Sequence, residues 1–398
     1  MIHEQLFEEF LKTRPRIAVD SRLVKPGDWF FALKGLKTDG HLHIEQALDL
    51  GAKKIIASQG PHAVVEDTLA ALQDLARKFI KNSSAKVIGV TGSIGKTTTK
   101  ELIYFLLKTK FKVGKTVGNQ NSQVGFPLTL LNEIKGDEDF LVLEMGMTEP
   151  GNIEKLVSIA PPDICIITMI APVHIVYFKD IEGIAKAKAE ILSSPKTKTA
   201  LINQKCLPYK EILEKAGKDL LYYGNKEDYP EPKLPRQHFE NFYGACKVFE
   251  LCGGKKEEII TDFPQIDRRF QKLEKNGVHF INDAYNASEI AVVAALKELP
   301  SGRKKIAVLG EMLELGKYSE QAHLNVAKVT LDTVDDVILV GKGTQPIKAF
   351  REEKGLKTPL FEDYKGALGY LREQAKEGDL VFLKGSRFWS LWKVFEEF

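Results

Sequence analysis

The apolar positions of the N-terminal stretch follow two different periods. Residues 1 to about 82 contain short β-like runs, RIAVDSR, DWFFAL and AKKIIAS, separated by glycine-rich turns, and one helical stretch, HIEQALDLGA. Short apolar runs bounded by turn residues indicate strands, whereas apolar positions three or four residues apart indicate a helix. This pattern predicts a small mixed α/β domain.

The rest of the chain alternates apolar runs with helical patterns. Between residues 86 and about 265 the runs are KVIGVTG, FLVLEMG and ICIITMI, and after residue 265 they are VHFINDAY, KKIAVLGEM, DDVILVGKG and DLVFLKGS. Such alternation indicates βαβ units on parallel sheets, whose ligands bind at the carboxyl ends of the strands. The polar segment KNSSA marks a domain boundary, and the proline-rich segment GNKEDYPEPKLPRQH predicts a loop.

The chain of 398 residues exceeds one ordinary core. We therefore predict an α/β protein of three domains: a small mixed domain at 1–83, a central P-loop ATPase-like parallel-sheet domain at 84–265 and a Rossmann-like domain at 266–398. The 57 basic residues nearly balance the 54 acidic ones, which argues against a dedicated nucleic-acid binder.

Cysteine usage and hydropathy bear on the compartment. The four cysteines show no CxxC or Cys/His ligand spacing, which argues against a structural zinc site and a disulfide framework and favours a reducing cytoplasm. The start, MIHEQLFEEFLKTRPR, lacks the features of a signal peptide. The most apolar segment is interrupted by Pro172 and His174 and is shorter than the roughly 20 residues that span a bilayer. We expect no membrane span.

The segment KVIGVTGSIGKTTTKELIYFLL has the order strand, glycine loop, helix that binds phosphate. A strict Walker A motif would place a glycine at position 90, where this chain has Val90, so the loop is a shortened variant, TGxxGKT. Gly92 and Gly95 let backbone N–H groups turn toward an anion at the start of a helix. Lys96 would meet the β/γ-phosphates and the Thr97 hydroxyl would bind Mg²⁺.

Three further polar residues are candidates on position alone. Glu144 ends the strand FLVLEMG, where a metal bridging phosphates needs an oxygen ligand, or it is a solvated charge at a strand end. His174 follows the strand ICIITMI, where a lone histidine is more often structural. Lys188 lies in the helical stretch IAKAKAEIL, and its spacing alone indicates an ordinary solvated face.

These segments together resemble the Mur ligase family, and most closely its MurF type. DSRLVKPGDWFFALKGLKTDGH is similar to the family's UDP-sugar-binding segment, TGSIGKTTTKE to its phosphate loop, and GNQNSQVGFPLTLL to an Asn-rich segment near substrate and phosphates. The UDP-sugar residues that the resemblance implies are Ser21, Arg22, Phe31, Asp39, Gly40 and His41, in a pattern that also includes Asp20 and Gly35.

The resemblance implies an ATP and Mg²⁺ site. It makes Lys96, His174 and Lys188 catalytic, with Lys188 carbamylated, because a carbamate offers oxygens to a hard metal and an ammonium group does not. The implied metal ligands are Thr97, Glu144, His174 and Lys188. The implied ATP-binding residues are Thr91, Gly92, Ser93, Gly95, Lys96, Thr97, Thr98, Arg268, Asp283 and Asn286.

Further family segments follow in matching order. RQHFENFYGA places His238 and Asn241 in family positions, NDAYNAS resembles the adenine-side motif with Tyr285, and Arg268 matches a hinge arginine that reaches ATP. AVLGEMLELG, His323 and KGSR complete the C-terminal pattern and favour the MurF type.

The activity that the resemblance implies is ATP-dependent formation of an amide between UDP-N-acetylmuramoyl-tripeptide and D-alanyl-D-alanine through an acyl phosphate. This is the last cytoplasmic step in the synthesis of the peptidoglycan precursor. We expect a monomer with small-molecule substrates and no nucleic-acid partner. The general base and the third residue of the tripeptide, diaminopimelate or lysine, stay open. Two alternatives also stay open: another Mur-family or folylpolyglutamate-type ligase, and a P-loop switch ATPase.

The sequence departs from the family pattern at the rim of the implied site. Ser122 and Met169 stand where asparagines are usual, and Ser288 and Glu289 where Asn-Pro is usual. We expect altered affinities for ATP or substrate. The chain is also shorter than typical members of the family, and the missing length lies near residues 206–236. This predicts a central sheet with fewer strands than is usual in the family.

Overall fold

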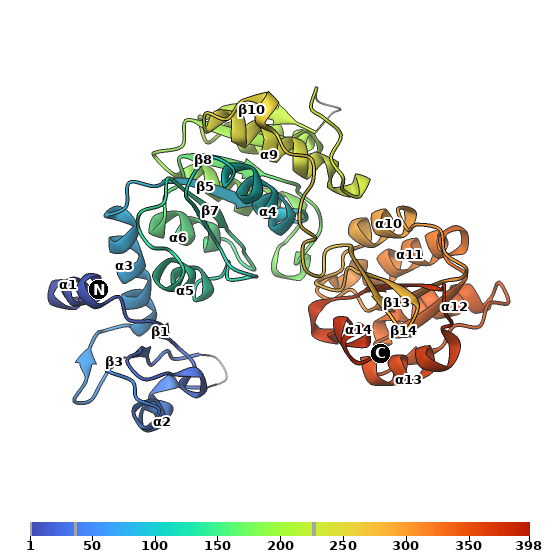
Figure 1. Cartoon of the computed structure of the whole chain (residues 1–398), viewed down its shortest axis with the longest axis horizontal. Helices are drawn as coiled ribbons and strands as arrows, with labels where there is room; N and C mark the ends of the chain where they lie inside the picture. Colours follow the sequence, from blue (N-terminus) through green and yellow to red (C-terminus); the bar gives the residue numbers. More distant parts are fainter. Residues whose placement is uncertain (1, 36–37, 225–227) are drawn as a thin grey trace. The chain divides into compact units, whose positions relative to one another are not determined.

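The computed structural model describes residues 2–35, 38–224 and 228–398. The chain forms two compact units (Figure 1). The first contains Met1–Ile170, Glu182–Tyr229 and Asn241–Ile259, and the second contains Ala171–Ile181, Pro230–Glu240 and Ile260–Phe398. The predicted loop at 224–238 runs between them in sequence, and its residues 225–227 lie outside the described residues.

The N-terminal part of the first unit is a small parallel sheet of the order β1-β2-β3-β4. Its elements are α1 (Glu4–Thr13), β1 (Ile17–Ala18), β2 (Trp29–Phe31), α2 (Ile44–Asp49), β3 (Lys54–Ala57), β4 (Ala63–Val64) and α3 (Thr68–Lys81). Alternation along β2 fills both faces, since successive strand residues point to opposite sides. Phe30 packs with residues of α2 and β3, whereas the Trp29 ring meets Phe10 of α1 edge-on at 6.2 Å, and Phe10 meets Phe79 of α3 at 6.0 Å.

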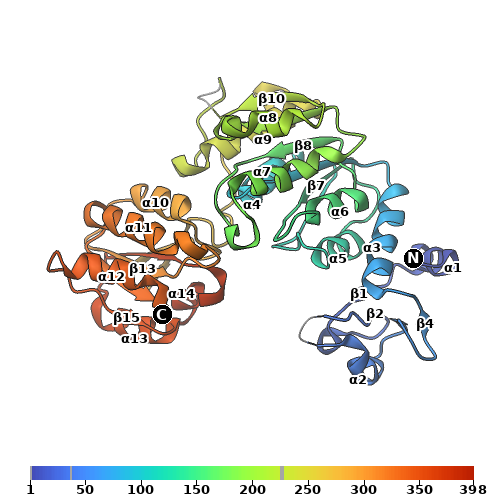
Figure 2. The ribbon, with the colours of Figure 1, turned by 180° about the vertical axis from the view of Figure 1, so that it is seen from behind.

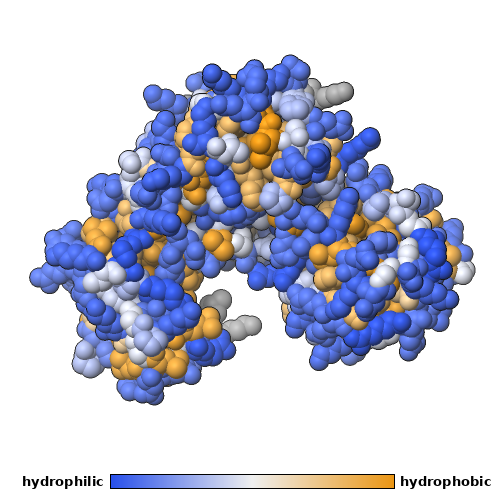
Figure 3. All heavy atoms as spheres, viewed as in Figure 1, coloured by the Kyte–Doolittle hydropathy of each residue, from blue (hydrophilic) through white to orange (hydrophobic). Residues whose placement is uncertain are grey.

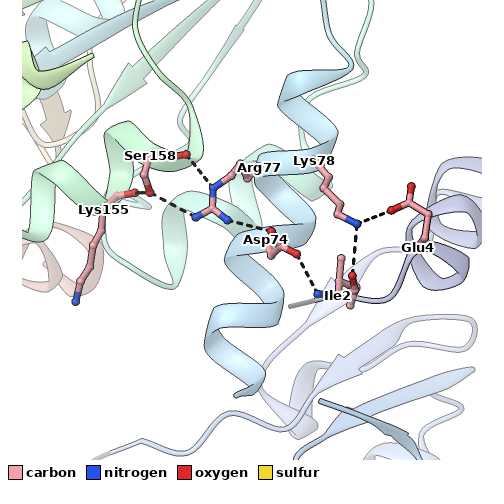
Figure 4. Close-up of polar contacts among 7 residues, drawn as sticks. All are labelled: Ile2, Glu4, Asp74, Arg77, Lys78, Lys155 and Ser158. Carbon is pink, nitrogen blue, oxygen red and sulfur yellow. Dashed lines mark hydrogen bonds and ion pairs between the residues drawn. The ribbon is translucent and has the colours of Figure 1, made fainter. Parts of the chain in front are cut away.

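Polar contacts join α3 to the N-terminal segment and to helix α6 (Asn152–Ile159) (Figure 4). The buried carboxylate of Asp74 accepts the backbone N–H of Ile2 at 3.0 Å and an Arg77 N–H at 3.0 Å. Arg77 in turn donates to the carbonyl of Ser158, at the end of α6, at 2.9 Å. On the next turn, Lys78 pairs with Glu4 at 2.6 Å. α3 therefore contacts both the N-terminal segment and α6, and the N-terminal sheet and the central sheet belong to one compact unit.

The central sheet of the first unit is parallel, with the order β10-β9-β8-β5-β7-β6 among the described residues. Its strands are β5 (Lys86–Thr91), β6 (Val113–Lys115), β7 (Phe140–Glu144), β8 (Ile164–Ile167), β9 (Thr199–Asn203) and β10 (Asp219–Tyr223). The helices between and after them are α4 (Lys96–Leu107), α5 (Gly125–Asn132), α6 (Asn152–Ile159), α7 (Ile181–Ala189), α8 (Lys210–Glu214) and α9 (Phe239–Leu251), and Figure 2 shows α6, α7 and α8 from behind. The region 206–236 contains α8 and the edge strand β10.

The second unit contains a sheet of the order β11-β12-β16-β13-β14-β15 among the described residues. Its strands are β11 (Gln271–Lys275), β12 (Val278–Asn282), β13 (Lys305–Gly310), β14 (Asp336–Val340), β15 (Leu360–Phe361) and β16 (Leu380–Lys384). Its helices are α10 (Glu289–Lys297), α11 (Ser319–Thr333), α12 (Gln345–Glu352), α13 (Tyr364–Gln374) and α14 (Trp392–Glu397). All pairs are parallel except β11 with β12.

Both faces of this sheet are covered, with α10, α11 and α12 on one side and α13 and α14 on the other (Figures 1 and 2). Along β13, Ala307 and Leu309 join the core beneath α10–α12, whereas Ile306 and Val308 join the core beneath α13 and α14. Burial on both faces explains why these strands are continuous apolar runs in the sequence. The predicted α/β class is confirmed.

On the face seen in Figure 3, hydrophilic residues cover most of the surface and apolar residues form separate groups. Among the described residues, no helix combines the length and the apolar character that crossing a membrane requires.

Candidate active site

The phosphate loop connects β5 to α4, as the sequence predicts. Gly92 has φ +148° and Gly95 has φ +90°, and both are positions where a side chain would collide with a neighbour. A Cβ on Gly92 would lie 2.0 Å from Oγ1 of Thr168, and one on Gly95 would lie 2.5 Å from Oδ1 of Asn241. Glycine is therefore required at both positions for conformation and for space.

The loop is held against the end of β8. The Thr168 hydroxyl donates to the carbonyl of Ile94 at 2.6 Å, and the Ser93 N–H donates to the carbonyl of Met169 at 2.7 Å. The Lys96 ammonium group donates to the carbonyl of Gly92 at 2.6 Å. It therefore lies against the same loop that would bind a phosphate. The N–H groups that follow, at the start of α4, form the positive end of a helix.

Glu144, at the end of β7, is buried at 2% exposure and meets the phosphate loop. Its Oε2 accepts the Thr97 hydroxyl at 2.9 Å, and its Oε1 accepts an N–H of Asn121 at 2.7 Å. A hydroxyl and a carboxylate that converge beside a phosphate loop are the hard oxygen donors that Mg²⁺ prefers. No group of three or more His, Cys, Asp and Glu side chains with metal-binding geometry occurs among the described residues.

Lys188 lies on α7 and is only 2% exposed. Burial lowers the pKa of its amine well below the usual value, and the charge of Lys96 lowers it further, against a smaller opposing effect of Glu144 and Glu190. Desolvation disfavours the charged form of a lysine. The solvated helix face that spacing alone indicated is therefore wrong for Lys188, whereas Lys186 on the same helix is exposed.

His174 belongs to the second unit, although it follows β8 in sequence. Its backbone is left-handed, with φ +60°, and its Nδ1 contacts the carboxylate of Glu314. Thr97, Glu144 and Lys188 belong to the first unit. Of the predicted metal ligands, Thr97 and Glu144 contact each other. His174 instead contacts Glu314.

The predicted adenine-side residues form a buried polar cluster in the second unit. Lys384 of the KGSR motif donates to Asp283 Oδ2 at 2.5 Å and to the carbonyl of Asn286 at 3.2 Å. The other oxygen of Asp283 accepts the N–H of Phe270 at 3.1 Å. Burial lowers the pKa of Lys384, and the charge of Asp283 opposes that effect. This cluster fixes the turn that follows β12 against the end of β16.

Cationic side chains lie on aromatic rings beside this cluster. The Arg268 guanidinium lies 4.3 Å from the centre of the Trp392 ring, and its backbone is left-handed with φ +55°. The guanidinium of Arg269 lies 4.0 Å from the Tyr285 ring. His323 of α11 is fully buried, and its ring accepts the backbone N–H of Met312 at 3.1 Å. This hydrogen bond holds the AVLGEMLELG segment against α11.

The residues of the predicted UDP-sugar segment surround two short 3₁₀ turns at the ends of the first strands. The Ser21 hydroxyl donates to Gln46 at 2.7 Å, and Arg22 pairs with Asp20 at 2.6 Å while staying 76% exposed. Asp39 accepts the N–H of His41 at 3.0 Å and contacts its ring at 2.6 Å. The segment also contains Phe31, which is fully buried, and Gly40, where a Cβ would lie 2.8 Å from the backbone of Leu33.

Several residues at the site were not singled out by sequence reasoning. Thr168 lies within the predicted strand ICIITMI and directly follows β8, where that strand ends in the structure, and Asn121 lies in the quoted Asn-rich segment. Glu314 lies in the AVLGEMLELG motif, but its contact with His174 joins residues 140 positions apart. No local pattern predicts such a contact.

Sequence comparison places these elements in a known class. Three family models match consecutive parts of the chain: the Mur ligase family catalytic domain at residues 16–90, the Mur ligase middle domain at 90–264 and the Mur ligase glutamate ligase domain at 268–387. The chain belongs to the Mur ligase family.

Individual relatives narrow the class. The chain is 32% identical to the UDP-N-acetylmuramoyl-tripeptide–D-alanyl-D-alanine ligase of Bacillus subtilis, over 96% of this chain and 92% of the relative. It is similar in structure to the MurF ligase of Thermotoga maritima in complex with ADP, with a TM-score of 0.82, 30% identity, and coverage of 96% of this chain and 97% of that one. The E. coli FolC protein shares the fold at 19% identity and a TM-score of 0.63, over 83% of this chain and 92% of its own.

Proposed function

We propose that this protein is the ligase that joins D-alanyl-D-alanine to UDP-N-acetylmuramoyl-tripeptide at the expense of ATP. The observation that carries the proposal is the similarity to ligases of that name over more than nine tenths of both chains, together with the built phosphate loop and its acidic partner Glu144. The acceptor carboxylate takes the γ-phosphoryl group of ATP to give an acyl phosphate. The amine of the dipeptide then displaces phosphate and forms the amide.

The protein's own groups supply positioning and charge. The backbone N–H groups of the loop and the start of α4 would hold the β- and γ-phosphates, and the Lys96 ammonium group would turn from the Gly92 carbonyl to the charge that develops in transfer. Asn121 keeps one oxygen of Glu144 occupied, which leaves the other directed at Thr97.

Thr97 and Glu144 are the residues that we propose to hold Mg²⁺, and we also propose His174 and Lys188 as metal ligands. Bound there, Mg²⁺ would neutralise charge on the phosphates. The oxygen donors at the phosphate loop fit a hard cation, since a hydroxyl and a carboxylate already converge within 2.9 Å.

Lys188 would join the ligand set as its carbamate. A carbamate forms from CO₂ and a neutral amine, and burial of Lys188 favours the neutral form. The positive charge of Lys96, which disfavours an ammonium group at Lys188, would favour the negative carbamate. In ¹³C-bicarbonate we expect a carbamate carbon signal in the wild type that Lys188→Met removes and that Lys186→Met, an exposed change on the same helix, retains. A signal that survives Lys188→Met would contradict the assignment.

We propose the cytoplasm as the compartment and the monomer as the working form. Cysteines without disulfide-type spacing support a reducing compartment. Sedimentation at working concentration tests the monomer, and a stable dimer would overturn it.

The decisive experiment is ATP-dependent phosphate release with each substrate omitted in turn. The proposal expects release only when UDP-N-acetylmuramoyl-tripeptide and D-alanyl-D-alanine are both present. ATP turnover with neither would favour a P-loop switch. Turnover with a pteroate substrate and glutamate would favour a folylpolyglutamate-type ligase, and turnover with another amino acid would favour a different Mur-type ligase.

A further inference from the structure

Two loops of the second unit meet at a carboxylate–imidazole contact. The first follows β8 and carries His174, and the second follows β13 and carries Glu314. The Nδ1 atom of the His174 ring contacts Oε2 of Glu314. The hydroxyl of Tyr177 reaches the other oxygen, Oε1, at 3.5 Å. Both carboxylate oxygens are therefore directed at the loop that carries His174.

The backbone at both contact residues is in a conformation that non-glycine residues adopt rarely. His174 has φ +60° and Glu314 has φ +63°. Such conformations persist where the surroundings impose them, and they cluster at functional sites. The two loops also approach closely beside these residues, because a Cβ on Gly316 would lie 3.0 Å from a methyl group of Val176.

The loop that carries Glu314 is itself held in place by hydrogen bonds to α11 and to the segment after β16. The N–H of Met312 donates to the buried ring of His323 at 3.1 Å, and the N–H of Leu313 donates to the Ser386 hydroxyl at 3.0 Å. The side chain of Leu315, directly after Glu314, is buried. The carboxylate therefore extends from a loop that is held on both sides, which is what a group that orients another side chain requires.

We infer that Glu314 is a positioning residue that holds the His174 ring with its hydrogen on Nδ1 and so presents Nε2 to a metal ion. The inference rests on the proposed function, in which His174 is a metal ligand. A histidine that binds a metal through one nitrogen commonly donates the other N–H to a carboxylate, and loss of that partner weakens metal binding about 10- to 100-fold. In the neutral ring, the hydrogen bond at one nitrogen decides which tautomer is present.

The test compares Glu314→Gln with Glu320→Gln, which removes an exposed glutamate from the start of α11 with the same change of charge. The first readout is ¹⁵N NMR of the imidazole nitrogens in metal-free full-length protein. The second is Mn²⁺ affinity by electron paramagnetic resonance with ADP and bicarbonate present, and His174→Ala marks complete loss of the histidine ligand.

We expect the wild type and Glu320→Gln to show the Nδ1–H form of His174, and Glu314→Gln to lose that preference and bind Mn²⁺ at least 10-fold more weakly. Should Glu314→Gln fail to fold, Glu314→Gly removes the carboxylate at a backbone conformation that glycine adopts without strain. Unchanged tautomer and Mn²⁺ affinity in the folded variant would overturn the inference. A wild type that shows the Nδ1–H form but has no ligase activity would instead count against the proposed function.

Discussion

The surroundings of the His238 ring predict how the free energy of unfolding of the second unit depends on pH. Its Nε2 is enclosed and has no hydrogen-bond partner among the described residues. Burial lowers the pKa of His238 to about 4, against the opposing charge of Asp283, and the nearby charge of Arg269 lowers it further. The ring is therefore neutral in the folded second unit at any pH where the protein is expected to work.

The direction of the pH effect follows from comparing the two states. In the unfolded chain a histidine has a pKa of about 6.5, so below that pH the unfolded state binds a proton that the folded state excludes. The free energy of unfolding therefore falls as the pH falls from about 6.5 to about 4. The pKa differs by about 2.5 units between the two states and one unit corresponds to about 1.4 kcal/mol, so the full loss from this residue is about 3.5 kcal/mol and is reached only below pH 4.

The assay is hydrogen exchange of peptides from β12 and β16, which reports the opening of the second unit, at pH values from 4 to 7. We expect the opening free energy of wild type minus His238→Gln to fall by about 3 kcal/mol across that range. Taking this difference at each pH cancels the intrinsic pH dependence of exchange and the other titrating groups. His279→Gln removes an exposed histidine from β12 and should leave the pH profile unchanged. A flat difference for His238→Gln would refute the assignment of a buried neutral ring.

Three further changes test other parts of the structure. Gly92→Ala places a Cβ 2.0 Å from the Thr168 hydroxyl, so ADP affinity should fall at least 10-fold, measured by calorimetry, while the N-terminal sheet stays folded. Lys384→Met leaves the buried carboxylate of Asp283 without its cation and should lower the stability of the second unit by about 3–5 kcal/mol in urea, less so in the double variant with Asp283→Asn. Asp74→Ala removes a buried acceptor of two N–H donors and should cost about 1–3 kcal/mol, seen as faster proteolysis near the N-terminus.

Strands buried on both faces could be read from the sequence, and short or polar ones could not. The runs around β5, β7, β8 and β13 are continuous and apolar, because helices cover both sides of their sheets. β11 has the sequence QKLEK and pairs antiparallel at the edge of its sheet, and it offered no such signal. β1 and β15 have two residues each, so pairing in the folded protein, and no local pattern, defines them.

The phosphate loop was predictable because its parts lie within one short segment. Its supports were not, because Thr168 lies 74 residues from Ile94, whose carbonyl it contacts, and Glu144 lies 23 residues from Asn121. Such contacts depend on the order of strands in the sheet. The neighbours of β5 are β7 and β8, so the ends of these three strands meet at the loop.

Three lysines among the described residues are buried, and they differ in whether the structure provides a partner for the ammonium group. Lys100 is fully buried, pairs with Glu101 at 3.0 Å and donates to a backbone carbonyl at 2.8 Å. Lys384 pairs with Asp283 at 2.5 Å. Lys188 is as deeply buried, but no hydrogen bond or ion pair joins its ammonium group to any residue that the structure describes. Because an unpaired buried ammonium group is costly, folding alone gives no reason for a lysine at position 188. A neutral amine that reacts with CO₂ gives a reason for a lysine there, since the product is an anion beside the positive charge of Lys96. The free energy of unfolding should therefore rise when bicarbonate is added to the wild type, and it should not rise in Lys188→Met.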